Sequence, residues 1–213
     1  MTIGGLREEL RQKTAHLHRE AEAALDLMNP ALPLARYREV LRLLHSVHTR
    51  TEPAILAHPG WAALGLDMPA RRKLPLLEED LAFIESRLRA AGEAGSPVIE
   101  EVAAGGAAAR QPAATFSWLD SFPAVLGAAY VVEGSTLGGV QIHRHLARVL
   151  GLGEGPGARF FACYGDQTGP RWKELLAAFE RASLGAADTE RAVAGAVHTF
   201  QALIDGARPA TSA

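Results

Sequence analysis

The sequence has little that would indicate a disulfide-bonded, membrane-spanning or nucleic-acid-binding protein. Its 213 residues include one cysteine, Cys163, so no internal disulfide can form. No stretch approaches the roughly 20 apolar residues that span a bilayer, and the amino-terminal segment lacks the apolar run of a signal peptide. The 22 basic and 24 acidic residues are scattered and leave no basic stripe for DNA or RNA. We therefore expect a cytoplasmic protein with neither a membrane nor a nucleic acid as partner.

Aromatic residues are also sparse, at 6% of the chain. Isoleucine and threonine are few, whereas alanine, leucine, arginine and glutamate dominate, and this composition favours helix over strand. No abrupt change in composition marks a linker between two folding units. We expect one all-α domain over residues 1–206, followed by a flexible tail over 207–213.

Apolar residues recur at spacings of three and four along most of the chain, which predicts amphipathic helices that begin and end at prolines, glycines or capping residues. No sustained period exists between residues 92 and 115, where only 98–102 could form a short turn of helix. The first predicted helix covers 6–28 and is ended by Asn29-Pro30, and a second begins at Pro33 and is bent or ended at Pro53. A third begins at 67–69, is interrupted at Pro75 and reaches Gly92. Three further helices are predicted over 121–150, 169–183 and 188–204.

The first predicted helix carries a face with possible metal chemistry. Arg11 and His18 are seven residues apart and stand almost above one another, about 10 Å apart along the axis, while Glu22 follows His18 by one turn. A haem lying on this face could take an iron ligand from His18, a propionate contact from Arg11 and an orienting hydrogen bond from Glu22, with the small Thr14 allowing close approach. The alternative is an ordinary solvated, salt-bridged surface. His16 points about 160° away from His18 and cannot share a metal with it.

Three glycines occur within six residues of another helix, at Gly134, Gly138 and Gly139. Each costs up to about 1 kcal/mol relative to alanine in a helix interior. Such a run predicts a helix that kinks, flexes or lets a flat ligand touch its backbone, although close packing against another helix is an alternative reason. A phosphate-binding loop is a poorer interpretation, because the spacing fits neither glycine motif and no strand precedes it.

Other clusters give weaker indications. No histidine has a glutamate three residues before it, which argues against the Glu-x-x-His pairs of di-iron bundles. His45 and His48 could jointly bind a metal, but a surface or packing role is the better interpretation. Cys163 is either a nucleophile or a small buried apolar residue, and the second is more common. Lys173 is either a propionate contact or an ordinary exposed lysine.

Taken together, these motifs resemble the haem oxygenase family, in particular bacterial biliverdin-producing members associated with bacteriophytochromes. The resemblance implies a multihelical bundle with haem b held between the first helix and a glycine-rich distal helix. It covers about Leu6 to Phe200 and rests on Leu6-Arg7, Thr14, His18, Glu22, the run 134–139 and a further similar run over 164–173.

The resemblance also implies roles for individual residues. His18 matches the proximal iron ligand, Gly134, Gly138 and Gly139 match the distal glycine motif, and Phe200 matches a phenylalanine that the last helix brings towards the haem. Arg11 and Lys173 match basic residues that bind propionates. One departure concerns the distal helix: animal enzymes have an aspartate directly after the first glycine, where this chain has Ser135. A second propionate-binding arginine is replaced by Ala177.

The activity implied by the resemblance is cleavage of haem to biliverdin, CO and iron, with haem as both cofactor and substrate. It consumes O2 and electrons from a donor protein or a small reductant, and a bacteriophytochrome is an expected acceptor of the bilin. We expect opening at the alpha position, and a water chain using Ser135 to deliver protons. Two alternatives remain: a haem carrier or sensor without chemistry, and a thiaminase-like hydrolase that uses Cys163 on the same helical scaffold.

Overall fold

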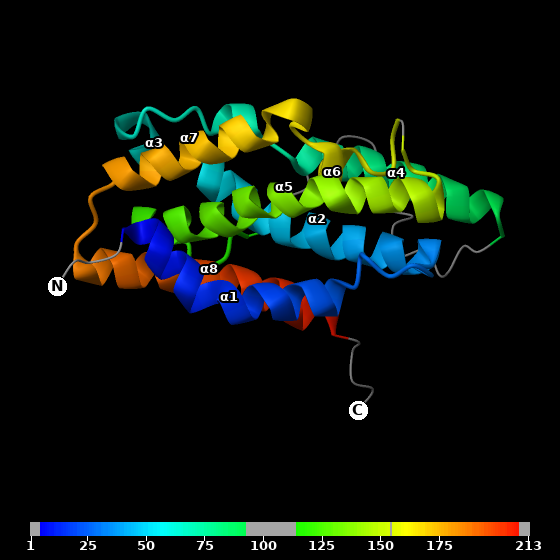
Figure 1. The fold of residues 1–213 in the computed structure, drawn as a ribbon, viewed down its shortest axis with the longest axis horizontal. Helices are drawn as coiled ribbons and strands as arrows, with labels where there is room; N and C mark the ends of the chain where they lie inside the picture. Colours follow the sequence, from blue (N-terminus) through cyan, green and yellow to red (C-terminus); the bar gives the residue numbers. More distant parts are fainter. Residues whose placement is uncertain (1–4, 93–113, 154, 209–213) are drawn as a thin grey trace.

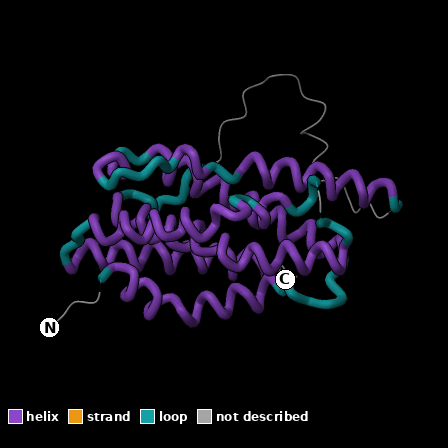
Figure 2. The backbone as a smooth tube through the Cα atoms, turned by 45° about the horizontal axis from the view of Figure 1, so that its top comes forward, coloured by secondary structure: helices purple, strands orange, loops and turns teal. Residues whose placement is uncertain are grey.

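A computed structural model describes residues 5–92, 114–153 and 155–208. All regular structure in these ranges is helical, which confirms the all-α prediction (Figures 1 and 2). The short helix predicted over 98–102 and the tail residues 209–213 lie outside the described residues. The elements are α1 (Leu6–Leu25), α2 (Leu34–Ala57), α3 (Gly60–Ala63), the 3-10 turn η1 (Pro69–Arg71), α4 (Leu74–Ala90), α5 (Phe122–Leu150), α6 (Arg159–Ala162), η2 (Gly165–Gln167), α7 (Thr168–Arg181) and α8 (Ala186–Ala207).

The first helix ends three residues earlier than its apolar period predicted. Asp26 adopts a left-handed conformation with φ 48° and its N–H bonds to the carbonyl of Glu22, which stops the helix before Asn29-Pro30. Leu27 is then free to turn into the core, where it is buried, while Met28 is half exposed. The mistaken boundary arose because Met28 continues the helical spacing although the backbone has already turned away.

Two prolines predicted at a helix end or interruption do not end or interrupt a helix. Pro53 neither ends α2 nor stops its burial, since the helix continues to Ala57 and Ile55 is in the core. Pro53 has no N–H for the carbonyl of Thr49 and its ring crowds that carbonyl, but only four residues of the helix follow it. Pro75 does not interrupt a helix that began at residue 67: it lies in the first turn of α4, where its missing N–H costs nothing, and η1 is a separate short turn.

Helix α5 is the longest element and packs most extensively on α8. It begins after Ser121 and ends at Gly151, which has a φ of 67°, as the sequence predicted. The two backbones touch where they cross. A Cβ on Gly127 would lie 1.8 Å from the carbonyl oxygen of Ala192, and one on Gly195 would lie 2.2 Å from that of Ala124. These glycines fix α8 closely against α5, and both helices line the cavity described below.

The interior consists of two apolar cores. The first joins α1, α5, α7 and α8, and the second joins α2, α4 and α6 with the carboxyl half of α5. Figure 1 shows α1 and α8 side by side at one edge of the bundle and α5 running along its length. Within the described residues no helix is both long and apolar enough to cross a membrane.

The loop before α6 is held by a buried carboxylate. Asp80 on α4 accepts hydrogen bonds from the backbone N–H groups of Gly157, Arg159 and Phe160, at 2.7 to 3.0 Å. The Tyr37 hydroxyl donates to the carbonyl oxygen of Gly157 at 2.7 Å. These contacts fix the start of α6 and so position Phe160 for the site.

Candidate functional site

A cavity lies where the two cores meet. Its volume is about 380 Å³, within the range of small-molecule pockets. Residues of α1, α2, α5, α6, α7 and α8 form its walls, and most of their side chains are apolar. The apolar lining is Ala21, Leu25, Leu27, Leu44, Val47, Val131, Val132, Leu137, Ile142, Phe160, Phe161, Trp172, Phe200 and Leu203.

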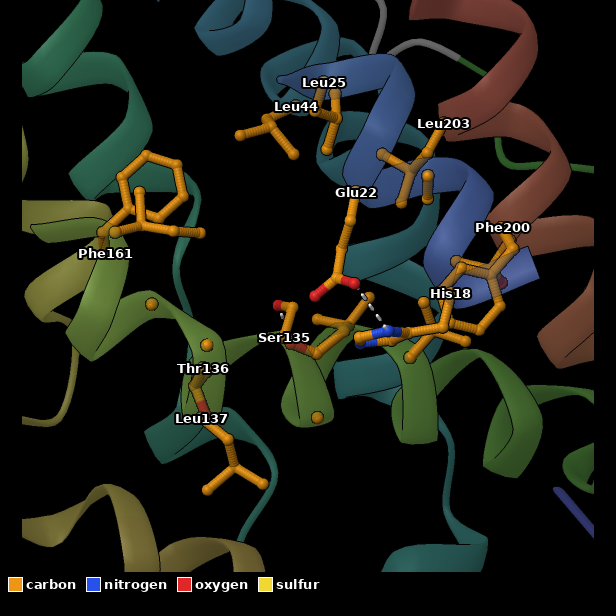
Figure 3. A pocket seen from close by; sticks show the side chains of 18 of the residues that line it. His18, Glu22, Leu25, Leu44, Ser135, Thr136, Leu137, Phe161, Phe200 and Leu203 are labelled. Carbon is orange, nitrogen blue, oxygen red and sulfur yellow. Dashed lines mark hydrogen bonds and ion pairs between the residues drawn. The ribbon is translucent and has the colours of Figure 1, made fainter. Parts of the chain in front are cut away.

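His18 and Glu22 supply polar groups to the α1 wall (Figure 3). The His18 Nδ1 lies 3.4 Å from a Glu22 carboxylate oxygen, and both side chains are more than half exposed. Phe200 from α8 is buried and meets the imidazole edge to face, with ring centroids 5.9 Å apart. Because Nδ1 faces the carboxylate, Nε2 is left to bind a ligand, and Phe200 limits rotation of the ring. His16 is exposed and is not part of the cavity wall.

Three other predicted haem contacts do not line the cavity. Thr14 is buried and its hydroxyl donates to the carbonyl of Leu10 at 2.7 Å. Arg11 is 63% exposed and pairs with Glu8 at 2.7 Å. Lys173 is exposed on α7.

Arg11 nevertheless acts electrostatically on Tyr130, which lines one end of the cavity together with Trp172. Their rings are 5.7 Å apart, and Lys173 follows Trp172 in sequence. Burial raises the pKa of Tyr130, while the positive charges of Arg7 and Arg11 act against that rise. The cavity therefore has one end with basic side chains nearby and a long apolar remainder.

The glycine segment, residues 134–139 of α5, forms another wall. Its glycines have different surroundings. A Cβ on Gly138 would meet nothing within 4 Å, and one on Gly134 would make an ordinary contact with Trp172 at 3.5 Å. A Cβ on Gly139 would lie 2.8 Å from the carbonyl oxygen of Phe161. Close packing on α6 therefore accounts for Gly139, whereas Gly138 keeps the cavity wall open.

Ser135 is exposed on this segment, and its hydroxyl donates to the carbonyl of Val132 at 2.9 Å. Thr136 donates in the same way to the carbonyl of Glu133 at 2.6 Å. Both hydroxyl hydrogens are thus used by the helix itself. Towards the cavity these side chains can offer lone pairs, and they can accept a hydrogen bond from water or substrate.

A buried ionic cluster lies directly behind the glycine segment, and the sequence reasoning missed it. Glu133 is 2% exposed and pairs with Arg71 at 2.7 Å and with the Lys73 ammonium. The Tyr164 hydroxyl lies 3.1 Å from the same carboxylate and 2.9 Å from Lys73. Burial alone would raise the pKa of Glu133, but the two cations outweigh it and the pKa is lowered. The cluster ties α5 to the segment between η1 and α4.

His48 is the second missed residue. It is 4% exposed, lines the cavity and meets Phe160 edge to face at 5.2 Å. Its Nδ1 lies 3.6 Å from a carboxylate oxygen of Glu52, one turn along α2. The signal was present in the sequence, because His48 and Glu52 repeat the spacing of His18 and Glu22. His45, the other histidine considered as a metal ligand, is 36% exposed and pairs with Glu78, so it does not share a metal site with His48.

Cys163 does not line the cavity. Burial raises the pKa of its thiol to about 11, so the nucleophilic thiolate is scarce near neutral pH. Among the described residues no three or more histidine, cysteine or carboxylate side chains gather into a metal site. A metal that arrives inside a macrocycle needs only one protein ligand, and His18 can be that ligand.

These residues fit haem. A flat apolar macrocycle requires an apolar cleft, and the lining supplies it. The iron requires a nitrogen ligand with an oriented ring, and His18 can supply one because Glu22 and Phe200 contact its imidazole. The propionates require cations, and Arg7 and Arg11 lie within electrostatic reach of Tyr130 in the cavity wall. Open space at Gly138 leaves room for a ring to approach the α5 backbone.

Comparison with known proteins agrees with haem as the ligand. A family model described as heme oxygenase matches residues 5–206. No curated protein is similar enough in sequence to count as a match. Similar solved structures include heme oxygenase from Leptospira interrogans (TM-score 0.71, 18% identity, covering 96% of this chain and 98% of that one). Heme oxygenase-1 from Synechocystis sp. PCC6803 in complex with heme is also similar (TM-score 0.64, 16% identity, covering 96% of this chain and 91% of that one). So is NO- and CO-bound heme oxygenase from Neisseria meningitidis (TM-score 0.60, 19% identity, covering 99% of this chain and 96% of that one).

Proposed function

This chain belongs to the haem oxygenase family, and we propose that it opens haem b to biliverdin, CO and free iron, with His18 as the proximal ligand. The observation that carries the residue assignment is the position of His18: it projects into an apolar cavity, one nitrogen faces Glu22, and the glycine segment forms another wall. Haem, when bound, supplies both the iron that binds O2 and the ring that is oxidised.

The α1 wall would orient the ligand. A carboxylate on Nδ1 fixes the imidazole tautomer with its proton on that nitrogen and makes Nε2 a better donor to iron. Phe200 restricts the ring to one rotational position. Glu22 is therefore a positioning residue in this proposal, and Phe200 is both a positioning residue and a contact of the macrocycle.

The basic end of the cavity would hold the propionates. Arg11 can exchange its exposed pair with Glu8 for a propionate, since an exposed ion pair contributes only about 0.2–1 kcal/mol. Lys173 would approach from α7. Thr14 would support the packing of α1 behind the haem face, since its buried hydroxyl is bonded to the Leu10 carbonyl. These contacts would set the rotation of the haem in its plane, and we propose opening at the alpha position.

The α5 wall would limit space above the ring. Gly134 and Gly138 allow the helix backbone to lie close to the substrate, and Gly139 holds that backbone against α6. Ser135 would accept a hydrogen bond from ordered water, because its own hydrogen is donated to Val132. Protons would arrive through water along this wall. The electrons would come from a donor protein or a small reductant in the cytoplasm, and a bacteriophytochrome is a proposed acceptor of the bilin.

One assay tests this function. Purified protein receives haem, then O2 with a reductant, and absorbance is recorded throughout. The proposal expects a Soret band that forms, decays and gives way to a bilin spectrum, with one mole of CO released per haem. A stable Soret band without a bilin indicates a carrier or sensor. No haem binding at all would favour the hydrolase alternative, which the buried thiol of Cys163 does not support.

A further inference from the structure

Arg71 joins the two helices that carry the glycine segment and Trp172. One terminal nitrogen of its guanidinium donates to the carboxylate of Glu133 on α5 at 2.7 Å and to the backbone carbonyl of Arg171 on α7 at 3.1 Å. The other terminal nitrogen donates to the carboxylate of Glu174, also on α7, at 2.7 Å. Because Arg71 is buried, these contacts fix its side chain. A single buried guanidinium therefore bridges α5 and α7.

Trp172 lies within the span of this bridge. On α7 the two anchor points, Arg171 and Glu174, stand on either side of it in sequence. On α5 the anchor Glu133 directly precedes Gly134. Two ring carbons of the indole lie 3.5 and 3.6 Å from the position that a Cβ on Gly134 would take. The bridge and the contact of the indole with the glycine therefore hold the same short stretches of α5 and α7 together.

Trp172 also lies at the mouth of the cavity. Its side chain lines the cavity, yet it is only partly buried. It packs on Tyr130, with the ring centroids 5.7 Å apart. A side chain that faces both the cavity and solvent narrows the passage between them, and indole is the largest side chain available for this purpose. Movement of Trp172 away from Gly134 would widen the passage.

The two carboxylates that hold Arg71 differ in exposure. Glu133 is buried and is bonded also to Lys73 and Tyr164, so the α5 end of the bridge is fixed. The Glu174 side chain is 60% exposed. Water and salt compete for an exposed carboxylate, and ion pairs of this kind are correspondingly weak. The bridge is therefore firm on α5 and easily released on α7, the helix that carries Trp172.

We propose that Arg71 and Glu174 are positioning residues that hold Trp172 across the mouth of the cavity, and that opening of the Arg71–Glu174 pair lets the bound tetrapyrrole leave. The inference rests on the proposed haem-opening function, which gives this cavity a bulky product, biliverdin, that has to be released. Opening of a closed site is often slower than the chemistry that precedes it. An exposed ion pair suits this role, because it restrains the indole without locking it in place.

The test measures ligand release from four variants: Glu174→Ala, Trp172→Leu, the double variant and Glu180→Ala. Glu174→Ala removes the carboxylate that Arg71 binds, and alanine maintains the helix. Glu180→Ala is the matched control, because Glu180 is exposed on the same helix but lies outside the bridge and the cavity lining. Each protein is loaded with haem or, separately, with biliverdin. The dissociation rate is followed by absorbance after mixing with excess apomyoglobin for haem or serum albumin for biliverdin.

We expect Glu174→Ala to release both ligands about twofold to fivefold faster than the wild type, as loss of an exposed ion pair predicts. Trp172→Leu should also release them faster, and adding Glu174→Ala to it should change nothing further, because the anchor acts through the indole. Added salt should accelerate release more in the wild type and Glu180→Ala than in Glu174→Ala. Release from Glu174→Ala at the wild-type rate, or independent effects in the double variant, would overturn the inference.

Failure of the proposed function gives a different result. If the wild type binds haem but never forms a bilin, the enzymatic assignment is wrong, yet haem release from the variants still tests the bridge. If the wild type forms biliverdin and Glu174→Ala releases it no faster, the function stands and the role of the bridge does not. If the wild type binds neither ligand, both are wrong.

Discussion

Replacing Gly138 and Gly139 separately by alanine distinguishes the two reasons for a glycine in α5. Alanine is favoured over glycine in a helix interior by about 1 kcal/mol, and this gain is the same at both positions. At Gly138 a methyl group meets nothing within 4 Å. Gly138→Ala should therefore stabilise the haem-free protein by up to about 1 kcal/mol. Because Gly138 lines the cavity, the same methyl should weaken haem binding.

At Gly139 the methyl would lie 2.8 Å from the carbonyl oxygen of Phe161, and backbone must move to admit it. Overpacking of this kind costs about 1–3 kcal/mol. Since the propensity gain cancels between the variants, Gly139→Ala should be less stable than Gly138→Ala by that amount. Urea unfolding of both haem-free variants measures the difference, and a haem titration followed by absorbance measures binding. Equal unfolding free energies would refute the tight α5–α6 contact, and unchanged haem affinity in Gly138→Ala would refute its place in the cavity wall.

Two further predictions concern buried groups. Glu133→Gln leaves Arg71 and Lys73 without their buried anion and should destabilise the protein by about 3–5 kcal/mol in urea unfolding at pH 7. Folding lowers the pKa of Glu133, so its carboxylate contributes its full stabilisation above the ordinary pKa of 4.5 and loses that stabilisation as the pH falls through the lowered pKa. The wild type should therefore lose more stability on acidification than Glu133→Gln does. Parallel curves of unfolding free energy against pH would contradict this. Cys163, with a pKa of about 11, should react with a thiol reagent at pH 8 more than about 100-fold slower than it does in urea-unfolded protein, and comparable rates would show that the thiol is activated.

Much of the helical architecture was predictable because burial follows the helical period. The spacing predicts one apolar face of α4 from Leu76, Leu77, Leu81, Ile84 and Leu88, and all of these are buried except Leu76, which is partly buried. Helix ends were less predictable, since they depend on backbone conformation: Asp26 enters the left-handed region although the apolar spacing continues. Pro53 shows that a breaker near a helix end is tolerated.

The candidate site was predictable where it lies on one helix. The spacing of His18 and Glu22 placed both on the same face, and the structure brings them within 3.4 Å. The ionic cluster was not predictable in this way, because Arg71 and Glu133 are 62 residues apart and meet only through the packing of η1 on α5. His48 was within reach of the same spacing argument that identified His18, and only the fold shows that its face lines the cavity.

The central claim, that His18 ligates the iron, is tested most directly by the spectra of two haem-loaded variants, His18→Ala and His16→Ala. His16 is two residues away on the exposed side of α1 and serves as the control. We predict that His18→Ala loses the absorption signature of an imidazole-ligated haem, forms no biliverdin, and regains the signature when imidazole is added, while His16→Ala matches the wild type. A His18→Ala spectrum identical to that of the wild type would contradict the account.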